Sequence, residues 1–399
     1  MFGSIPGAKY TASRLAAFVP EDLHRLRQSL REVDDRLQDN LRRRLEIARQ
    51  IGLTKRERGL PLRDYGVERE VVDRWRSGLA PSGVTTVRSE AFARWLVEES
   101  IRVQDEVGES PRRAASPSDV LVIGGAGRMG RWVGGFLSSV GHRVAISDPR
   151  AGTAHSPFPV KTDLARAVQD SAIVVVATPM RAAPPVFREI WKSETEAVVF
   201  DLLSLKAPII SSIRRGRDSG FHVASAHPLF GPDVRSLWGR NLVVVDCGDP
   251  FATRTVVQLF AHSSLNTSVI PLELHDKLMA DALALPHVVS LLFGLTLGGS
   301  AANLETLGSV APTSFFRQVD ATRVVSHENP ELSFDIQTLN PAMEPLFQRM
   351  EQALGTLRDA VRGQNPEAYE RLLANVALTS DRVASRREPG GKPENPPAE

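Results

Sequence analysis

Several features are scarce in this sequence, and each shortage excludes a class of protein. There is one cysteine, Cys247, in 399 residues, which excludes an internal disulfide and a cysteine-rich metal site. Charge is nearly balanced, with 49 basic and 47 acidic residues, so no overall field recruits nucleic acid or an anionic membrane. Residues 1–20 lack the apolar core of a signal peptide, and no apolar run looks long enough to span a bilayer. We expect a soluble cytoplasmic protein that binds no metal.

The length is sufficient for two or three domains with substantial cores. The pattern predicts a multidomain chain: an all-α module, then an α/β Rossmann domain, then another all-α domain. The expected divisions are a flexible N-terminus at 1–20, the first helical module at 21–108, a linker at 109–118, the Rossmann domain at 119–272, the second helical domain at 273–386 and a disordered tail at 387–399.

A glycine-rich turn marks the start of the Rossmann domain. The apolar run 119–123 leads into Gly125, Gly127 and Gly130, which form G-x-G-x-x-G, and the helical pattern 131–140 follows. The first glycine allows the turn, the second lets the backbone approach a pyrophosphate, and the third lets helix and strand pack closely. The helix N-terminus would hold the pyrophosphate. This order of strand, turn and helix predicts a dinucleotide site.

The acid expected to bind the adenosine ribose is Asp148, which ends a second strand at 143–147. A carboxylate would repel a 2′-phosphate, so Asp148 favours NAD over NADP, although Arg150 close by weakens that preference. The predicted cofactor-binding residues are Gly124, Gly125, Gly127, Arg128, Met129, Gly130, Asp148 and Thr178.

Further strands and their loops should build the rest of the site. Ligands of such sheets bind beyond the carboxyl ends of the strands, which here are followed by the segments 178–180, 201–206 and 225–233. A helix is expected at 208–215. We expect the sheet to include strands at 172–177, 197–203, 222–225 and 242–245, with 267–271 closing it.

The first module reads as three helices without a strand. Leucines and other apolar residues recur at three- and four-residue steps through 21–51, which predicts an unusually long helix with one apolar stripe. Such a helix needs a partner, and a dimer is the simplest source. Two further helices are expected at about 68–77 and 87–107.

Polar residues share faces of these helices. Arg44 and Lys55 are eleven positions apart and lie on nearly one face, while Ser100 and Gln104 form an i, i+4 pair. Arg27 lies about 100° around the first helix from Arg44. We therefore expect Arg27 to serve a site on another chain.

With these motifs the module resembles the all-helical chorismate mutase family over about residues 23–104. The matching segments are Leu26-Arg27, Arg43-Arg44-Leu-Glu46, Gly52-x-x-Lys55, Glu68-Arg69-Glu70 and Glu98-x-Ser100-x-x-x-Gln104. The rearrangement of chorismate needs no proton transfer or nucleophile, so orientation and electrostatics supply the catalysis. The resemblance implies that Arg44 and Arg27 of the partner subunit hold the carboxylates with Arg69 and Ser100, that Lys55 and Gln104 donate to the ether oxygen, and that Glu70 accepts from the ring hydroxyl.

Of the three segments that follow strand ends, the one after the 222–225 strand has the most distinctive sequence and is the best indicator of function. His227-Pro-Leu-Phe-Gly-Pro-Asp233 places a histidine in a stiff loop at a strand end. Together with 124–130 and Asp201-x-x-Ser204-x-Lys206, this loop resembles the prephenate dehydrogenase family over about residues 120–336. Further matches are Glu273-Leu-His275-Asp276, Leu285-Pro-His287 and Thr322-Arg323.

The resemblance implies oxidative decarboxylation of prephenate with NAD, in which His227 takes the proton of the 4-hydroxyl group. It also implies that Arg323 binds a substrate carboxylate. Other expected substrate-binding residues are Thr178, Ser204, Lys206, His275 and His287. The helical patterns 274–298, 340–363 and 366–387 would form a dimerisation domain that completes the cleft.

Three functions stay open at this point. The first is a bifunctional enzyme of tyrosine biosynthesis that takes chorismate through prephenate to 4-hydroxyphenylpyruvate. The second performs the same two reactions on the 4-amino analogues. The third is a dimeric metabolite sensor in which the Rossmann domain only binds NAD, and His227 and Lys55 argue against it.

Overall fold

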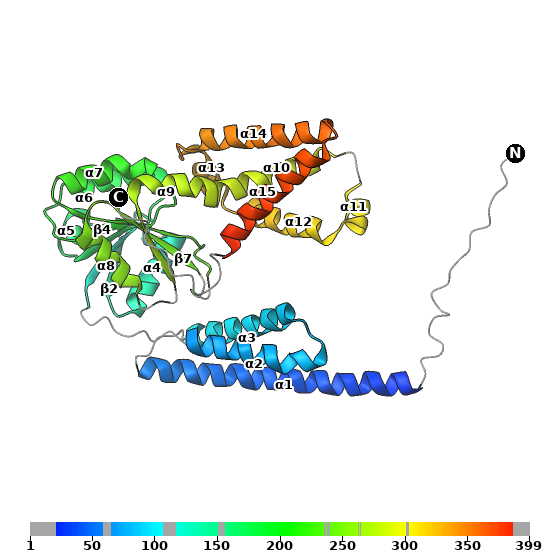
Figure 1. Cartoon of the computed structure of the whole chain (residues 1–399). Coiled ribbons are helices and arrows are strands. Elements are labelled where there is room, and N and C mark those ends of the chain that lie inside the picture. Colours follow the sequence, from blue (N-terminus) through cyan, green and yellow to red (C-terminus); the bar gives the residue numbers. More distant parts are fainter. Residues whose placement is uncertain are drawn as a thin grey trace.

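The computed structural model describes residues 21–58, 65–106, 117–150, 156–234, 237, 240–261, 263, 265–300 and 303–385. Figure 1 shows a first helical module, a Rossmann domain and a second helical module in chain order. This order confirms the predicted fold class. The expected N-terminus and tail, and most of the expected linker, lie outside the described residues.

The first helical module consists of α1 (Glu21–Glu57), α2 (Tyr65–Leu79), the short η1 (Ala80–Ser82) and α3 (Thr86–Glu106). The long helix is confirmed and extends six residues past the expected end at 51. Figure 1 shows that the N-terminal part of α1 runs beyond α2 and α3. The described residues therefore leave its apolar stripe uncovered there: the exposed fractions of Leu26, Leu30 and Leu37 are 67%, 60% and 60%.

The Rossmann domain begins with a five-stranded parallel sheet in the order β2-β1-β3-β4-β5. Its strands are β1 (Asp119–Ile123), β2 (Arg143–Ser147), β3 (Ile173–Val176), β4 (Val198–Asp201) and β5 (His222–Val223). Ile123 is opposite both Ser147 and Val176, and Val176 is opposite Asp201. The register thus brings the residues that follow β1 to β4 to one edge of the sheet.

A second sheet contains β6 (Ser225–Pro228), β7 (Asn241–Asp246) and β8 (Asn266–Pro271) in that order. The prediction that these segments continue the first sheet is wrong. The chain leaves the first sheet at Ala224, and β6 then pairs antiparallel with β7, with His227 opposite Val243. The reversal places His227 at the junction of the two sheets instead of on a continuous parallel ladder.

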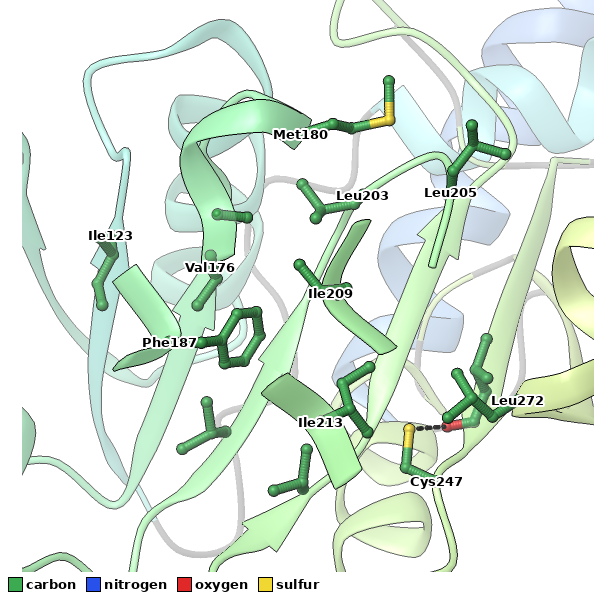
Figure 2. Packing of buried hydrophobic residues seen from close by; sticks show 14 of the residues in the cluster. Ile123, Val176, Met180, Phe187, Leu203, Leu205, Ile209, Ile213, Cys247 and Leu272 are labelled. Atoms are coloured by element: carbon green, nitrogen blue, oxygen red, sulfur yellow. Dashed lines mark hydrogen bonds between the residues drawn. The ribbon is translucent and has the colours of Figure 1, made fainter. Parts of the chain in front are cut away.

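Two apolar clusters fill the faces of the domain. One lies under α4 (Arg128–Ser139) and α8 (Pro250–Phe260), and the other lies under α5 (Leu164–Gln169), α6 (Ala183–Ile190) and α7 (Ile210–Asp218). Figure 2 shows the second cluster, in which Ile213 lies near Cys247 and Phe187 lies near Val176. Burial raises the pKa of the Cys247 thiol far above its ordinary value, so this cysteine is an inert core residue.

The second helical module follows from Leu272. It comprises α9 (Leu272–Met279), the π-helical η4 (Ala280–Ala284), α10 (Leu285–Gly298), α11 (Leu304–Val310), α12 (Thr313–Ser326), α13 (Pro330–Thr338), α14 (Met343–Arg362) and α15 (Pro366–Ser385). The helices α11 to α13 were not anticipated from the sequence. Arg181 donates to Asp335 at 2.7 Å and joins α13 to the Rossmann domain.

The run from Leu272 to Gly298 corrects one expectation. Among the described residues this 27-residue helical run is long and apolar enough, by length and composition, to cross a membrane. The expectation that no apolar run reaches that length is therefore wrong. Only 28% of its most apolar window is buried, and Leu292 and Leu295 are 51% and 76% exposed. This helix presents an apolar face that the described residues leave largely uncovered.

The glycine turn gives a matched pair of substitutions. A Cβ on Gly130 would collide with the Gly124 carbonyl oxygen, whereas one on Gly135, in the same helix, would meet nothing within 4 Å. We expect Gly130→Ala to lower the free energy of unfolding by about 2 kcal/mol, and Gly135→Ala to raise it by up to about 1 kcal/mol. Chemical denaturation measures both. Equal effects of the two substitutions would contradict the close packing of the turn.

Candidate active sites

The glycine turn is shaped for close approach of a ligand. Gly124 has φ of +83°, and a Cβ there would lie 2.7 Å from the Ala177 carbonyl oxygen. A side chain would therefore be strained and obstructed. The helix α4 begins at Arg128, and its N-cap Gly127 supplies no side-chain cap. The first N–H groups of α4 are thus left for an anionic ligand.

The carboxylate of Asp148 lies beside this turn. It accepts hydrogen bonds from the backbone N–H groups of Ala126 at 3.1 Å and Arg150 at 2.8 Å. Burial tends to raise the pKa of this carboxyl group, but the hydrogen bonds from Arg150 and Ala126 outweigh it and leave the pKa below its ordinary value. Asp148 is therefore ionised at the end of β2, and the turn and the acid together fit a dinucleotide.

An ion pair connects the turn with the loop that follows β6. Arg128, the first residue of α4, pairs with Asp233. Met129, the next residue, is half-buried. Because Asp233 follows His227 in the same loop segment, this pair brings the predicted cofactor turn and the predicted base to the same side of the domain.

His227 forms a buried chain with its neighbours. Its Nδ1 lies 3.2 Å from Nε2 of His275, and Nδ1 of His275 lies 2.7 Å from Oδ1 of Asp276. His227 is 4% exposed. Burial, and then the charges of Lys206 and His275, hold the pKa of His227 well below 6.5. At neutral pH His227 is uncharged and able to accept a proton.

The prediction that Lys206 contacts the substrate does not match the structure. Its ammonium group is buried and donates to Asp201 at 2.8 Å, to the Leu203 carbonyl at 2.7 Å and to the Ala226 carbonyl at 2.9 Å. An ammonium group has three donors, and all three are used. Lys206 is a structural residue that holds the strand end just before His227.

His275, also predicted to bind the substrate, is instead buried between His227 and Asp276. The remaining predicted substrate-binding residues have no hydrogen bond to His227 among the described residues. The Oγ1 of Thr178 and the Nδ1 of His287 are buried without a partner in the described part of the chain. The Nε2 of His287 lies 3.5 Å from Glu328. Ser204 is half-buried and Arg323 is exposed. Two atoms thus remain available for a ligand, and the roles of these four residues stay predictions.

In the first helical module, α1 and α3 bring predicted residues together. Arg44 donates to the Ser100 hydroxyl and, at 2.8 Å, to the Leu96 carbonyl. Burial lowers the pKa of Arg44 from its ordinary value, because the guanidinium group is poorly solvated there. A Cβ on Gly52 would lie 2.9 Å from Cα of Gln104, so the backbones touch where the Gln104 side chain is buried.

Gln104 and Lys55 are two more predicted residues near the contact of α1 with α3 at Gly52. The Gln104 Oε1 is buried without a partner among the described residues, and half-buried Lys55 lies one turn of α1 beyond Gly52. Glu70 and Arg27 are exposed, and Arg27 is about 25 Å from Arg44 along the axis of α1. Arg27 therefore does not serve the site of its own chain. The side chain of Arg69 lies outside the described residues.

Sequence reasoning missed two contributors. Asp276 appeared only as a neighbour of His275, yet it accepts hydrogen bonds from His275 and from the backbone of Lys206 and Ala207. The Leu96 carbonyl, which accepts from Arg44, carries no side-chain signal at all. The His-Asp dipeptide in α9 was the available clue for Asp276.

These features are those of a nicotinamide-dependent dehydrogenase, in which a dinucleotide lies across the carboxyl edge of a parallel sheet, with a separate helical site ahead of it. The family model for chorismate mutase type II matches residues 26–105. The models for the nucleotide-binding and dimerization domains of prephenate dehydrogenase match residues 145–244 and 271–375. The chain therefore belongs to the prephenate dehydrogenase family and carries a chorismate mutase type II domain in the same polypeptide.

Individual relatives agree with this assignment. The T-protein of Enterobacter agglomerans is 25% identical over 342 residues, covering 84% of this chain and 86% of the relative. A 4-amino-4-deoxyprephenate dehydrogenase of Streptomyces pristinaespiralis is 29% identical over 272 residues, covering 64% and 89%. Prephenate dehydrogenase from Aquifex aeolicus, solved with hydroxyphenyl propionate and NAD+, shares the fold with a TM-score of 0.53 and 19% identity, covering 68% of this chain and all of that one.

The structural role of Lys206 can be tested. Lys206→Met leaves the buried Asp201 carboxylate without its cation, and breaking such a pair costs about 3–5 kcal/mol of the free energy of unfolding. Lys277→Ala, on the exposed side of α9, should change it by less than about 0.5 kcal/mol. Denaturation curves compare the two variants. A Lys206→Met protein of ordinary stability with a raised KM would favour the substrate contact instead.

Proposed function

We propose that the chain converts chorismate into prephenate in its first helical module and then converts prephenate into 4-hydroxyphenylpyruvate with NAD. The observation that carries this proposal is that the domain families of both enzymes match one polypeptide. The same polypeptide aligns with a T-protein over 84% of its own length. The geometry adds an arginine–serine pair suited to a carboxylate in the first module and a neutral buried histidine in the second.

The mutase reaction requires only fixed charges and hydrogen-bond donors around the substrate. Arg44, which donates a hydrogen bond to Ser100, would bind one carboxylate of chorismate, and Arg27 of the partner subunit would bind the second carboxylate. Lys55 and Gln104 would donate to the ether oxygen, where negative charge grows in the transition state. Arg69 and Glu70 would complete the pocket from α2. The burial of Gln104 against Gly52 of α1 supports this arrangement.

The dehydrogenase reaction needs a base and an anion clamp. Bound NAD supplies the acceptor for the hydride on the ring carbon that bears the 4-hydroxyl group. His227 would accept the hydroxyl proton at Nε2 as the hydride leaves. The bond between the ring and its carboxylate would then break to release CO2, its electron pair would make the ring aromatic, and the 4-oxygen would take the proton back from His227 to become the phenol hydroxyl. Arg323 would hold the side-chain carboxylate of prephenate. Thr178, Ser204 and His287 would line the pocket, and the unpartnered atoms of Thr178 and His287 support this.

A homodimer completes the proposal. The dimerization-domain model covers 271–375, and exposed leucines such as Leu295 on α10, Leu354 on α14 and Leu373 on α15 provide apolar faces. The uncovered stripe of α1 provides another. Burial of the α10 face against a second subunit accounts for its apolarity without a membrane. The cytoplasmic location expected from the sequence stays a prediction.

The 4-amino pathway is the second candidate, because the relative from S. pristinaespiralis is 29% identical. It is less supported, since that alignment covers 64% of this chain, whereas the T-protein alignment covers 84%. The substrates differ in one ring substituent. Assays with chorismate and NAD, run beside the 4-amino analogue, separate the two functions by their kcat/KM values.

Two single variants test whether the chain has two independent sites. Lys55→Ala removes the donor to the ether oxygen and should slow chorismate loss by about 100-fold or more. His227→Asn removes the base and should slow NADH formation from prephenate by about 100- to 10,000-fold. Each variant should retain the other activity, which controls for folding. Loss of both activities in either folded variant would refute separate sites.

The low pKa of His227 predicts the pH profile. The base works when neutral, and activity falls as the pH drops through its pKa, which lies below 6.5. The acid limb of kcat/KM for prephenate is therefore expected well below pH 6.5, where an unperturbed histidine would place it. Initial rates of NADH formation measure this limb, and mutase rates at the same pH values report unfolding. A limb at or above 6.5 would be inconsistent with the buried, neutral histidine.

A further inference from the structure

The hydrogen bonds around His227 leave one consistent arrangement of protons. Hydrogen bonds from Lys206 and Ala207 and the contact with His275 keep the pKa of Asp276 low despite its burial, so it is an acceptor only. The Nδ1 of His275, 2.7 Å from Asp276, must then carry a proton. Burial lowers the pKa of His275, so its ring is neutral and its Nε2 is unprotonated.

The same reasoning extends to the next ring. The unprotonated Nε2 of His275 lies 3.2 Å from Nδ1 of His227 and can only accept, so Nδ1 of His227 carries the proton. His227 is neutral, and its Nε2 is therefore the free acceptor. Within the described residues this Nε2 has no hydrogen-bond partner.

We propose that Asp276 is a positioning residue that sets the tautomer of His227 through His275, so that Nε2 of His227 faces the substrate as a proton acceptor. The proposal rests on the function proposed above and adds a residue that touches neither substrate nor cofactor. Without the carboxylate, the histidine pair could hold its protons in the reverse order, with a hydrogen on Nε2 of His227. That form cannot accept the proton of the 4-hydroxyl group.

The anchoring of Asp276 supports this role. Its Oδ1 accepts from the Lys206 N–H at 2.8 Å and its Oδ2 from the Ala207 N–H at 2.6 Å. Its own carbonyl accepts from Asn340 at 2.9 Å. Lys206 meanwhile holds the Ala226 carbonyl, next to His227. Lys206 therefore contacts both ends of the chain of hydrogen bonds from Asp276 through His275 to His227. The charged groups that face the two histidines are Asp201, Lys206 and Asp276.

The kinetic test uses Asp276→Asn, in which an amide can donate to Nδ1 of His275 and reverse both tautomers. We expect kcat for prephenate oxidation to fall by about 100- to 10,000-fold; a wrong histidine tautomer in a hydrolase triad lowers kcat by about 10,000-fold. KM for prephenate and Kd for NAD should change less than about threefold. Asp276→Glu, which keeps a carboxylate, should recover part of the rate. Asp281→Asn, a carboxylate on the same helical run that pairs with Arg349, is the matched control and should leave kcat unchanged.

The structural test measures the tautomers directly. Nitrogen-15 NMR of the histidine rings in the wild-type protein should show Nδ1 of His227 protonated and Nε2 bare, and Asp276→Asn should reverse them. A wild-type His227 protonated on Nε2 would overturn the proposal, as would an Asp276→Asn enzyme with normal kcat. Mutase activity checks that each variant is folded, and if Asp276→Asn fails to fold, the wild-type spectrum decides. Absence of prephenate turnover by the wild-type enzyme would refute the proposed function but leave the tautomer result standing.

Discussion

The ion pair between Lys206 and Asp201 is the interaction on which the dehydrogenase half depends. Both side chains are almost completely buried, at 1% and 0% exposed, so each charge is stabilised by the other. The carbonyl groups of Leu203 and Ala226 also stabilise Lys206, and the Leu203 N–H donates to Asp201. Lys206 joins the end of β4 to β6 through Ala226. It therefore holds together the two sheets at the point where the chain changes from one to the other. A lone charge there would be too costly to bury.

The two sites solve different electrostatic problems. The helical site works with permanent charge: Arg44 stays cationic although partly buried, and its hydrogen bonds orient it before a ligand arrives. The dehydrogenase site needs a group without charge, and burial near Lys206 keeps His227 neutral. A buried lysine next to the base thus has an electrostatic effect as well as a structural one. In the proposed function, a fixed cation would bind substrate in one module, while in the other a fixed cation suppresses protonation of His227.

Much of this could be predicted from residues close together in the sequence. The structure confirms the glycine turn, the long α1 and the order of the three parts. These features could be predicted because they depend on local periodicity and turn chemistry. The prediction that β6, β7 and β8 continue the first sheet was wrong, because an apolar run does not show which strand it will pair with or in which direction. The helices α11 to α13 were overlooked, and the length of the apolar run at 272–298 was misjudged.

The role of Lys206 was also misjudged, since a lysine in a loop motif looks the same whether its ammonium group faces a ligand or three acceptors. Asp276 had no predicted role because its partners, Lys206 and Ala207, are about 70 positions away along the chain. Arg27, Arg69, Glu70, Ser204 and Arg323 keep their predicted roles as hypotheses. Several of these lie on exposed surfaces that a second subunit would cover, and one sequence read alone does not place residues across such an interface.

The π-helical turn η4 separates His275 and Asp276 from His287 along one continuous helical run. A π turn holds an extra residue relative to an α-helical turn. Removing one residue from Ala280–Ala284 would let the run become regular α-helix, and because the π turn already takes up the extra residue, the helix after it would keep nearly the same phase. A deletion from the regular α-helix on either side would instead rotate everything after it by about 100°. His287 and the apolar face of α10 would then point elsewhere, while the start of α9 stayed in place. The run should therefore tolerate the loss of one residue inside this short segment better than the loss of one beside it.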